Sequence, residues 1–237
     1  MQEFAATHVG LIVGAVFALI VGLIVLGVVA ALRANRRRSD TIREWAFRSG
    51  YNFTPGPMPA QQLAPIDRFE VKGETVEASA RNVASASRVT LFDFDHATRH
   101  QSGTFNNRTQ YQRRTASCAL FKLEEPLPRF TFSAMSTFDQ NSLAGKMMAA
   151  VINIADRSSG IIPIADRPGF LLHTDEDADR VRSLFREPHF FDDKCGWNVL
   201  STGSWMLLSC NPVAPENYDT FRNQAQTIYD HFRHSSS

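Results

Sequence analysis

The chain has 237 residues, a formal net charge of +1 and 18 phenylalanines. This length allows a membrane helix and one sizeable folded core, and the high aromatic content excludes a chain that is disordered throughout. The balanced charge does not indicate a nucleic-acid-binding protein, so we expect no nucleic-acid partner.

An apolar segment runs from Val9 to Leu32 without a charged residue or a proline. A helix needs about 20 apolar residues, at ~1.5 Å each, to cross the hydrocarbon core of a bilayer. A cleaved signal peptide would begin with basic residues, whereas Glu3 is the only charged side chain before this segment. The segment therefore predicts one uncleaved transmembrane helix.

Basic residues gather directly after the apolar segment, and no lysine or arginine precedes it; they are Arg33, Arg36, Arg37, Arg38, Arg43 and Arg48. Such a bias holds the basic end in the cytoplasm. We therefore expect residues 1–8 outside the cell, a bacterial inner-membrane location, and a cytoplasmic domain. Four of the arginines are also candidates for contact with anionic lipid headgroups, although a topology signal alone explains them equally well: Arg33, Arg36, Arg37 and Arg38.

Small residues recur every four positions within and just before the apolar segment, at Ala6, Gly10, Gly14, Ala18 and Gly22. A strip of small residues lets two helix backbones approach closely in lipid. We state a homodimer through this helix as a hypothesis, with Gly10, Gly14, Ala18 and Gly22 as its contact residues. Chance is the alternative, because glycine and alanine are common in membrane helices.

Residues 33–66 are expected to form a basic juxtamembrane segment, a short helix and an irregular crossing. Ser39-Asp40 carries a helix start signal, and Gly50 a stop signal, so the short helix is predicted from Thr41 to Ser49. Four prolines between Pro55 and Pro65 predict the crossing.

Residues 67–237 are expected to form the cytoplasmic domain. Its first strands are predicted by β-forming residues or by alternation, at Phe69–Lys72, Thr75–Asn82, Arg88–His96, Thr115–Leu123 and Phe130–Ser133. The polar stretch Ala97–Arg114 between two of these strands predicts a wide hairpin whose tip is solvated or disordered. Arg108, Tyr111, Arg113 and Arg114 could contact phosphate or RNA there, but a solvated tip is the preferred reading. Helical spacing of apolar residues predicts a helix at Asn141–Ala155.

The last third of the chain predicts a β-α-β-β-α order. Its elements are a strand at Gly169–His173, a helix at Asp175–Arg186 behind a capping box that begins at Thr174, strands at Cys195–Leu200 and Trp205–Cys210, and a closing helix at Pro215–His231. The closing helix is expected to bury Tyr218, Phe221, Ala225, Ile228 and Phe232. Hairpin strands with helices packed on the sheet give an α+β fold class.

The strand ending Asp93-Phe94-Asp95 resembles the first motif of haloacid-dehalogenase-type phosphatases. In that family the first aspartate attacks phosphorus, the second acts as acid and base, and Mg²⁺ neutralises charge; Asp193 could supply the later metal ligand. However, His96 and Ala97 stand where the family has Gly-Thr, and a polar loop follows instead of a helix. The alternative is a half-exposed strand on which Asp93 and Asp95 share one face.

Metal and thiol chemistry receive no support from the sequence. Asp93, Asp95, His96 and His100 lie close in sequence, but successive strand residues face opposite sides of a sheet. The three cysteines, Cys118, Cys195 and Cys210, have no C-x-x-C spacing and suit buried thiols in a reducing compartment. We therefore assign no catalytic, cofactor-binding or metal-binding residue.

Several short motifs resemble a bacterial family of single-pass membrane-anchored proteins that carry a soluble α+β domain of unknown function. They are Arg81-Asn82-Val83, the strand Val89–Phe94, Ser117–Leu123, Pro126–Phe130 and the strand–helix unit Gly169–Arg186. The resemblance implies topology and fold and carries no activity. From the residues we expect a non-enzymatic binding or scaffolding module at the inner membrane, with the lipid bilayer and an unidentified protein as partners. The alternative is a membrane-tethered Mg²⁺-dependent phosphatase that uses Asp93 and Asp95.

Overall fold

A computed structural model of the chain describes residues 2–63, 74–102, 108–134, 161–162, 170–174, 176–185 and 196–235. Side chains are described for most of these residues, beginning at residue 16. The predicted strand at Phe69–Lys72, the predicted helix at Asn141–Ala155, Asp193 and Cys195 lie outside the described residues.

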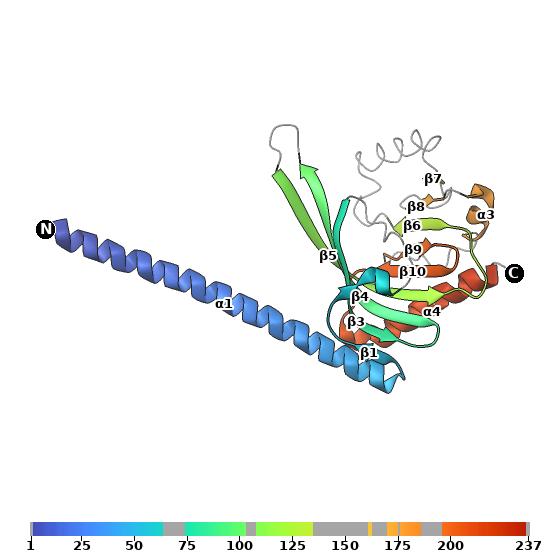
Figure 1. The fold of residues 1–237 in the computed structure, drawn as a ribbon, viewed down its shortest axis with the longest axis horizontal. Helices are drawn as coiled ribbons and strands as arrows, with labels where there is room; N and C mark the ends of the chain where they lie inside the picture. The colour runs from blue at the N-terminus through green and yellow to red at the C-terminus, as the bar shows by residue number, and fades with distance from the viewer. Residues whose placement is uncertain are drawn as a thin grey trace.

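The helix α1 (Gln2–Arg48) runs without interruption from the apolar segment into the folded domain (Figure 1). The predicted start of a separate helix at Ser39-Asp40 was wrong. Ser and Asp act as N-caps only where the preceding backbone is not helical, and here the helix is already formed when it reaches them. The predicted stop at Gly50 is confirmed: its φ is +75°, and Tyr51 N–H donates to Ala46 O at 2.8 Å in a C-terminal cap.

One antiparallel sheet forms the centre of the domain, in the order β1-β3-β4-β5-β10-β9-β6-β8-β7, with β2 also paired to β3. Its described strands are β1 (Asn52–Thr54), β2 (Met58–Pro59), β3 (Glu74–Ser85), β4 (Val89–Ser102), β5 (Arg108–Lys122), β6 (Phe130–Ala134), β7 (Ile161–Ile162), β8 (Phe170–His173), β9 (Asn198–Ser201) and β10 (Trp205–Cys210). A short 3₁₀ helix, η1 (Ala60–Gln62), follows β2 in the segment predicted as irregular.

The hairpin of β4 and β5 is much longer than predicted. The two strands pair continuously from Val89↔Phe121 to Ser102↔Arg108. The predicted hairpin is present, but its strands continue through most of Ala97–Arg114, so their predicted ends at His96 and Thr115 were wrong; residues 103–107 between the strands lie outside the description. The pairing of β3 with β4 ends at Arg99, and beyond it β4 pairs only with β5 among the described strands, where the sequence shows no apolar alternation.

The helix α3 (Ala178–Ser183) starts later than predicted. Its N-cap is Asp177, whose carboxylate accepts hydrogen bonds from the N–H groups of Asp179 and Arg180. Thr174 was expected to cap this helix, but its hydroxyl donates to Arg129 O at 2.5 Å. The Thr174 hydroxyl also accepts from the N–H of Glu176 at 3.1 Å, but the helix begins only at Ala178, so the predicted capping box at Thr174 was wrong.

The helix α4 (Tyr218–Ser235) follows the 3₁₀ turn η3 (Pro215–Asn217) and closes the domain. The five side chains predicted to be buried on it are all buried: Tyr218, Phe221, Ala225, Ile228 and Phe232. They pack with Ile42, Trp45 and Ala46 of α1 against one face of the sheet. A smaller cluster around Phe92, Phe94 and Ala60 covers part of the other face. The α+β fold class and the β-α-β-β-α order (β8-α3-β9-β10-α4) are confirmed.

Candidate functional site

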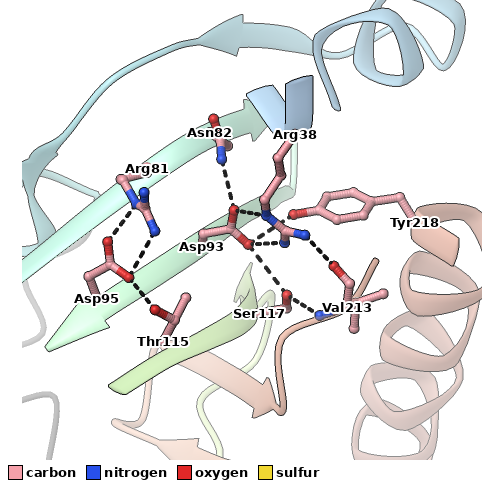
Figure 2. Close-up of polar contacts among 9 residues, drawn as sticks. All are labelled: Arg38, Arg81, Asn82, Asp93, Asp95, Thr115, Ser117, Val213 and Tyr218. Carbon is pink, nitrogen blue, oxygen red and sulfur yellow. Dashed lines mark hydrogen bonds and ion pairs between the residues drawn. The ribbon is translucent and has the colours of Figure 1, made fainter. Parts of the chain in front are cut away.

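The most concentrated polar arrangement in the described structure surrounds Asp93, in the middle of β4. Its side chain is completely buried, on the sheet face that α1 and α4 cover. Arg38 binds it with two nitrogens: Nε lies 2.9 Å from Oδ2 and Nη2 lies 2.6 Å from Oδ1 (Figure 2). This two-point geometry is the strongest that a guanidinium and a carboxylate can form. It joins the helix that leaves the domain to the central sheet.

Three further side chains donate hydrogen bonds to the same carboxylate. Asn82 Nδ2 lies 2.8 Å from Oδ2, Tyr218 OH lies 3.2 Å from Oδ1, and Ser117 Oγ lies 3.4 Å from Oδ1. A buried charge is tolerated when its lone pairs are filled in this way. Asp93 is thus fully engaged by residues of α1, β3, β5 and α4 (Figure 2).

The remaining Arg38 nitrogen, Nη1, donates to Val213 O at 2.7 Å, in the segment between β10 and η3. The N–H of Val213 donates in turn to Ser117 Oγ at 2.9 Å. The guanidinium carbon also lies 6.0 Å from the centre of the Tyr218 ring, within cation–π range. We call this set of residues the Arg38–Asp93 network; it consists of Arg38, Asn82, Asp93, Ser117, Val213 and Tyr218.

Asn82 reaches Asp93 because β3 is irregular at this point. The register between β3 and β4 shifts between Arg81 and Ala84, and Asn82 has a φ of +52°. Asparagine tolerates this left-handed conformation better than most residues. The Arg81-Asn82-Val83 segment is part of the family resemblance, but no sequence pattern predicts a partner for Asn82 that lies 11 residues away.

Asp95 lies two residues along β4 and has a different environment. Its side chain is 31% exposed and pairs with Arg81, while Thr115 Oγ1 donates to Oδ1 at 2.6 Å (Figure 2). Asp93 and Asp95 lie on the same face of β4, as predicted, but only Asp95 is partly exposed, and the predicted exposure of Asp93 was wrong. Two helices distant in sequence cover the strand at Asp93, which strand periodicity could not show.

This environment also bears on the phosphatase alternative. A nucleophilic aspartate must reach phosphorus, whereas Asp93 is sealed beneath α1 and α4 with every partner supplied by the chain. In addition, β4 continues into an antiparallel ribbon with β5 and does not lead into a helix. Asp93 therefore has no access to a phosphate ester in this structure.

The four arginines proposed for lipid contact fall into two groups. The predicted lipid contact of Arg38 was wrong, because its guanidinium lies inside the Arg38–Asp93 network with a side chain only 21% exposed. Arg33, Arg36 and Arg37 are exposed on α1, and their contact with headgroups stays a prediction. Association through Gly10, Gly14, Ala18 and Gly22 also stays a prediction; a Cβ atom added at Gly22 would meet nothing within 4 Å in a single chain.

His96 lies on the other face of β4 from Asp95, next to Phe94, with ring centres 5.3 Å apart. Burial, and then the positive charge of Arg114, lowers the pKa of His96. Within the described residues, no group of three His, Cys, Asp or Glu side chains is arranged to hold a metal ion.

Cys118 and Cys210 are buried thiols that form no disulfide, as expected for two of the three cysteines. Burial, and then the proximity of Cys210 and Asp93, raises the pKa of Cys118 well above its usual value, so little thiolate exists at neutral pH. We expect maleimide labelling of Cys118 in the folded protein to be slower than in urea by orders of magnitude, measured by mass spectrometry of its peptide. Labelling at equal rates in both states would contradict the buried position.

Burial, and then the negative charge of Asp93, raises the pKa of Tyr218 above the ordinary value of 10.0. The folded state therefore holds this phenol neutral at pH values where the unfolded chain ionises it. Stability from this residue is complete below about pH 10 and is lost as the pH rises above that value. We expect the free energy of unfolding to fall above about pH 10, and to fall less steeply in Tyr218→Phe, measured by urea denaturation at a series of pH values.

The comparisons with known proteins identify no family for the chain. No family model and no curated protein matches it. The crystal structure of the mycobacterial trehalose monomycolate transport factor A (TtfA) is similar at a TM-score of 0.48 and 10% sequence identity, over 86% of this chain and 94% of that chain. At this level of similarity nothing is inferred about function. The absence of a family match is consistent with the resemblance to a family without an assigned activity.

Proposed function

We propose that the chain is a single-pass protein of the bacterial inner membrane whose domain lies in the cytoplasm and serves as a non-enzymatic binding or scaffolding module. Support for the membrane comes from α1, which is long and apolar enough to cross a bilayer. Its apolar side chains are exposed in the chain on its own, as lipid contact requires; Phe17 is 68% exposed and Leu26 is 66% exposed. The arginines that follow the apolar segment support the orientation.

The observation that carries the proposal is the junction of helix and domain. The helix enters the core directly, and a buried two-point ion pair at Arg38 and Asp93 fixes it to the sheet. A tethered enzyme that must reach dispersed substrates gains nothing from this rigidity. A module that presents one face at a set distance and angle from the bilayer depends on it.

Fusions to the C-terminus test the orientation. Alkaline phosphatase is active only outside the cytoplasm. Green fluorescent protein becomes fluorescent only when it stays in the cytoplasm, and not after export by the general secretory route. We expect a fluorescent C-terminal fusion and an inactive phosphatase fusion. The opposite pair of results would place the domain outside and remove the cytoplasmic part of the proposal.

The scaffolding role is tested by making the connection between the membrane helix and the domain flexible while both are left unchanged. A flexible Gly-Ser segment inserted between Leu32 and Arg33 leaves both the apolar helix and the Arg38–Asp93 network intact. In cells that lack the native protein, we expect the inserted form to accumulate in the membrane and to fail to restore the native phenotype. A helical insertion of equal length, made of Glu, Ala and Lys, serves as the control for added mass. Full restoration by the flexible form would contradict a role for rigid presentation.

We also propose that the membrane helix associates with a second copy through Gly10, Gly14, Ala18 and Gly22. The supporting feature is the row of small side chains, which permits close backbone approach. Replacing Gly14 and Gly22 by isoleucine is expected to lower association in a membrane dimerisation assay at least several-fold. Replacing Val9 and Val16 by isoleucine is the matched control, because at ~100° per residue both lie on the side of the helix opposite the row of small residues. Equal association in all three forms would contradict the hypothesis.

A further inference from the structure

The outer part of the β4–β5 hairpin extends beyond the rest of the sheet. β10 pairs with β5 only from Ser117 to Lys122, and the pairing of β3 with β4 ends at Glu74↔Arg99. The pairing of β4 with β5 continues to Ser102↔Arg108. We call the paired residues 96–102 and 108–114 the outer ribbon. In Figure 1 it leaves the domain toward the side from which the N-terminal part of α1 extends.

The Arg38–Asp93 contact gives a common origin for comparing how far the outer ribbon and α1 extend. From Asp93 to Ser102 there are nine strand residues at ~3.3 Å each, a length of about 30 Å. From Arg38 back to Leu32, the end of the apolar segment, there are six helical residues at ~1.5 Å each, or about 9 Å. The ribbon therefore reaches the membrane surface when its projection on the α1 axis is only about a third of its length. It arrives there even when it diverges from α1 by tens of degrees.

The sequence of the outer ribbon carries charge of one sign. Between His96 and Arg114 it has Arg99, Arg108, Arg113 and Arg114 and no aspartate or glutamate, although the whole chain has 24 acidic residues. Glu74 and Glu77 of β3 lie in register with Arg99 and Ala97, so they flank the base of the ribbon. No described strand pairs with the ribbon beyond Glu74.

We propose that the outer ribbon is a second membrane contact, which binds the headgroups of anionic phospholipids at the surface that α1 crosses. This inference rests on the proposed membrane anchoring. Position and charge both support it: the ribbon lies within reach of the bilayer, and arginines near an anionic surface are strongly attracted to it. Lipid is favoured over nucleic acid because the tether keeps lipid headgroups permanently beside the ribbon, whereas the near-neutral chain has no long-range attraction for nucleic acid.

The test places a photo-crosslinking benzoylphenylalanine at Gln110 in the full chain, reconstituted in nanodiscs. Gln110 pairs with His100 in the outer ribbon and removes no charge when replaced. We expect lipid to be captured in nanodiscs that contain phosphatidylglycerol, and several-fold less in pure phosphatidylcholine. The same probe at Phe47, which is 85% exposed on the domain end of α1, is the matched control and should capture little lipid in either.

Charge removal gives the second arm of the test. Changing Arg99, Arg108, Arg113 and Arg114 to glutamine is expected to reduce phosphatidylglycerol capture at Gln110, by roughly five-fold in the bound-to-free ratio for each arginine. Changing four other arginines, Arg129, Arg180, Arg182 and Arg222, alters the net charge equally and should leave the capture unchanged.

A third probe separates the failure of this inference from the failure of the anchoring. Benzoylphenylalanine at Val21, within the apolar segment, should capture lipid whenever α1 is inserted. Capture at Val21 without capture at Gln110 would overturn the second contact and leave the anchor intact, and no capture at either would overturn both. Preferential capture of RNA at Gln110 when RNA and lipid are both present would also overturn the lipid assignment.

Discussion

Replacing Asp93 by asparagine is expected to lower the free energy of unfolding of the domain by about 3–5 kcal/mol. The substitution keeps the size of the side chain but leaves the Arg38 guanidinium partly buried without a counter-charge. Tyr218, Ser117 and Asn82 would also lose their charged acceptor. Urea denaturation of the full chain in detergent micelles measures the effect, with the fluorescence of the buried Trp45 and Trp197 as the signal.

Asp95→Asn is the matched control, because Asp95 lies on the same strand and the same face. Its pair with Arg81 is about a third exposed on both sides, so the loss should be no more than about 1 kcal/mol. Combining Asp93→Leu with Arg38→Met removes both buried charges and should recover much of the stability lost in Asp93→Asn. Equal losses for Asp93→Asn and Asp95→Asn would show that Asp93 is not buried in a charged network.

The parts of the fold that local sequence determines were predicted well. The spacing of Tyr218, Phe221, Ala225 and Ile228 defines one face of α4, and that face is buried. The stop of α1 at Gly50 was also predictable, because the backbone there needs a positive φ that glycine adopts without strain. In both cases the information lies within a few residues of the feature.

The candidate site could not be predicted in this way. Arg38 and Asp93 are 55 residues apart, and Arg38 and Val213 are 175 apart, so no local pattern joins them. Arg38 lies in a basic cluster whose presence a topology signal already accounts for. Asp93 lies in a strand where a polar residue at that position is expected from the alternation of polar and apolar residues. Only the packing of α1 across β4 distinguishes Arg38 from Arg36 and Arg37.

The extent of the β4–β5 hairpin was missed for another physical reason. Strand prediction relies on alternation between a buried and a solvated face, and this signal ends where the ribbon leaves the sheet. From Thr98 to Ser102 the chain keeps strand pairing without any apolar side chain. The strand is recognised there by its backbone pairing, which the pattern of side chains in the sequence does not predict.

Replacing Asn35 by proline is expected to separate the orientation of the domain from that of the membrane helix. Asn35 is exposed on α1 between Leu32 and Arg38, so the substituted side chain lies outside both the apolar segment and the Arg38–Asp93 network. Proline in a helix interior removes a backbone hydrogen bond and clashes with the carbonyl four residues earlier, here that of Ala31, at a cost of about 3 kcal/mol to a continuous helix. The helix should relieve this cost by kinking.

Distance distributions between spin labels at Val29 and Gln226 measure the result in nanodiscs, with Cys195 replaced by serine. We expect a narrow distribution in the native form and a broad or shifted one in Asn35→Pro, with Asn35→Ala as the control that keeps the helix. The free energy of unfolding of the domain should stay within about 0.5 kcal/mol, because its core is untouched. An unchanged distance distribution in Asn35→Pro would show that the continuous helix does not set the position of the domain.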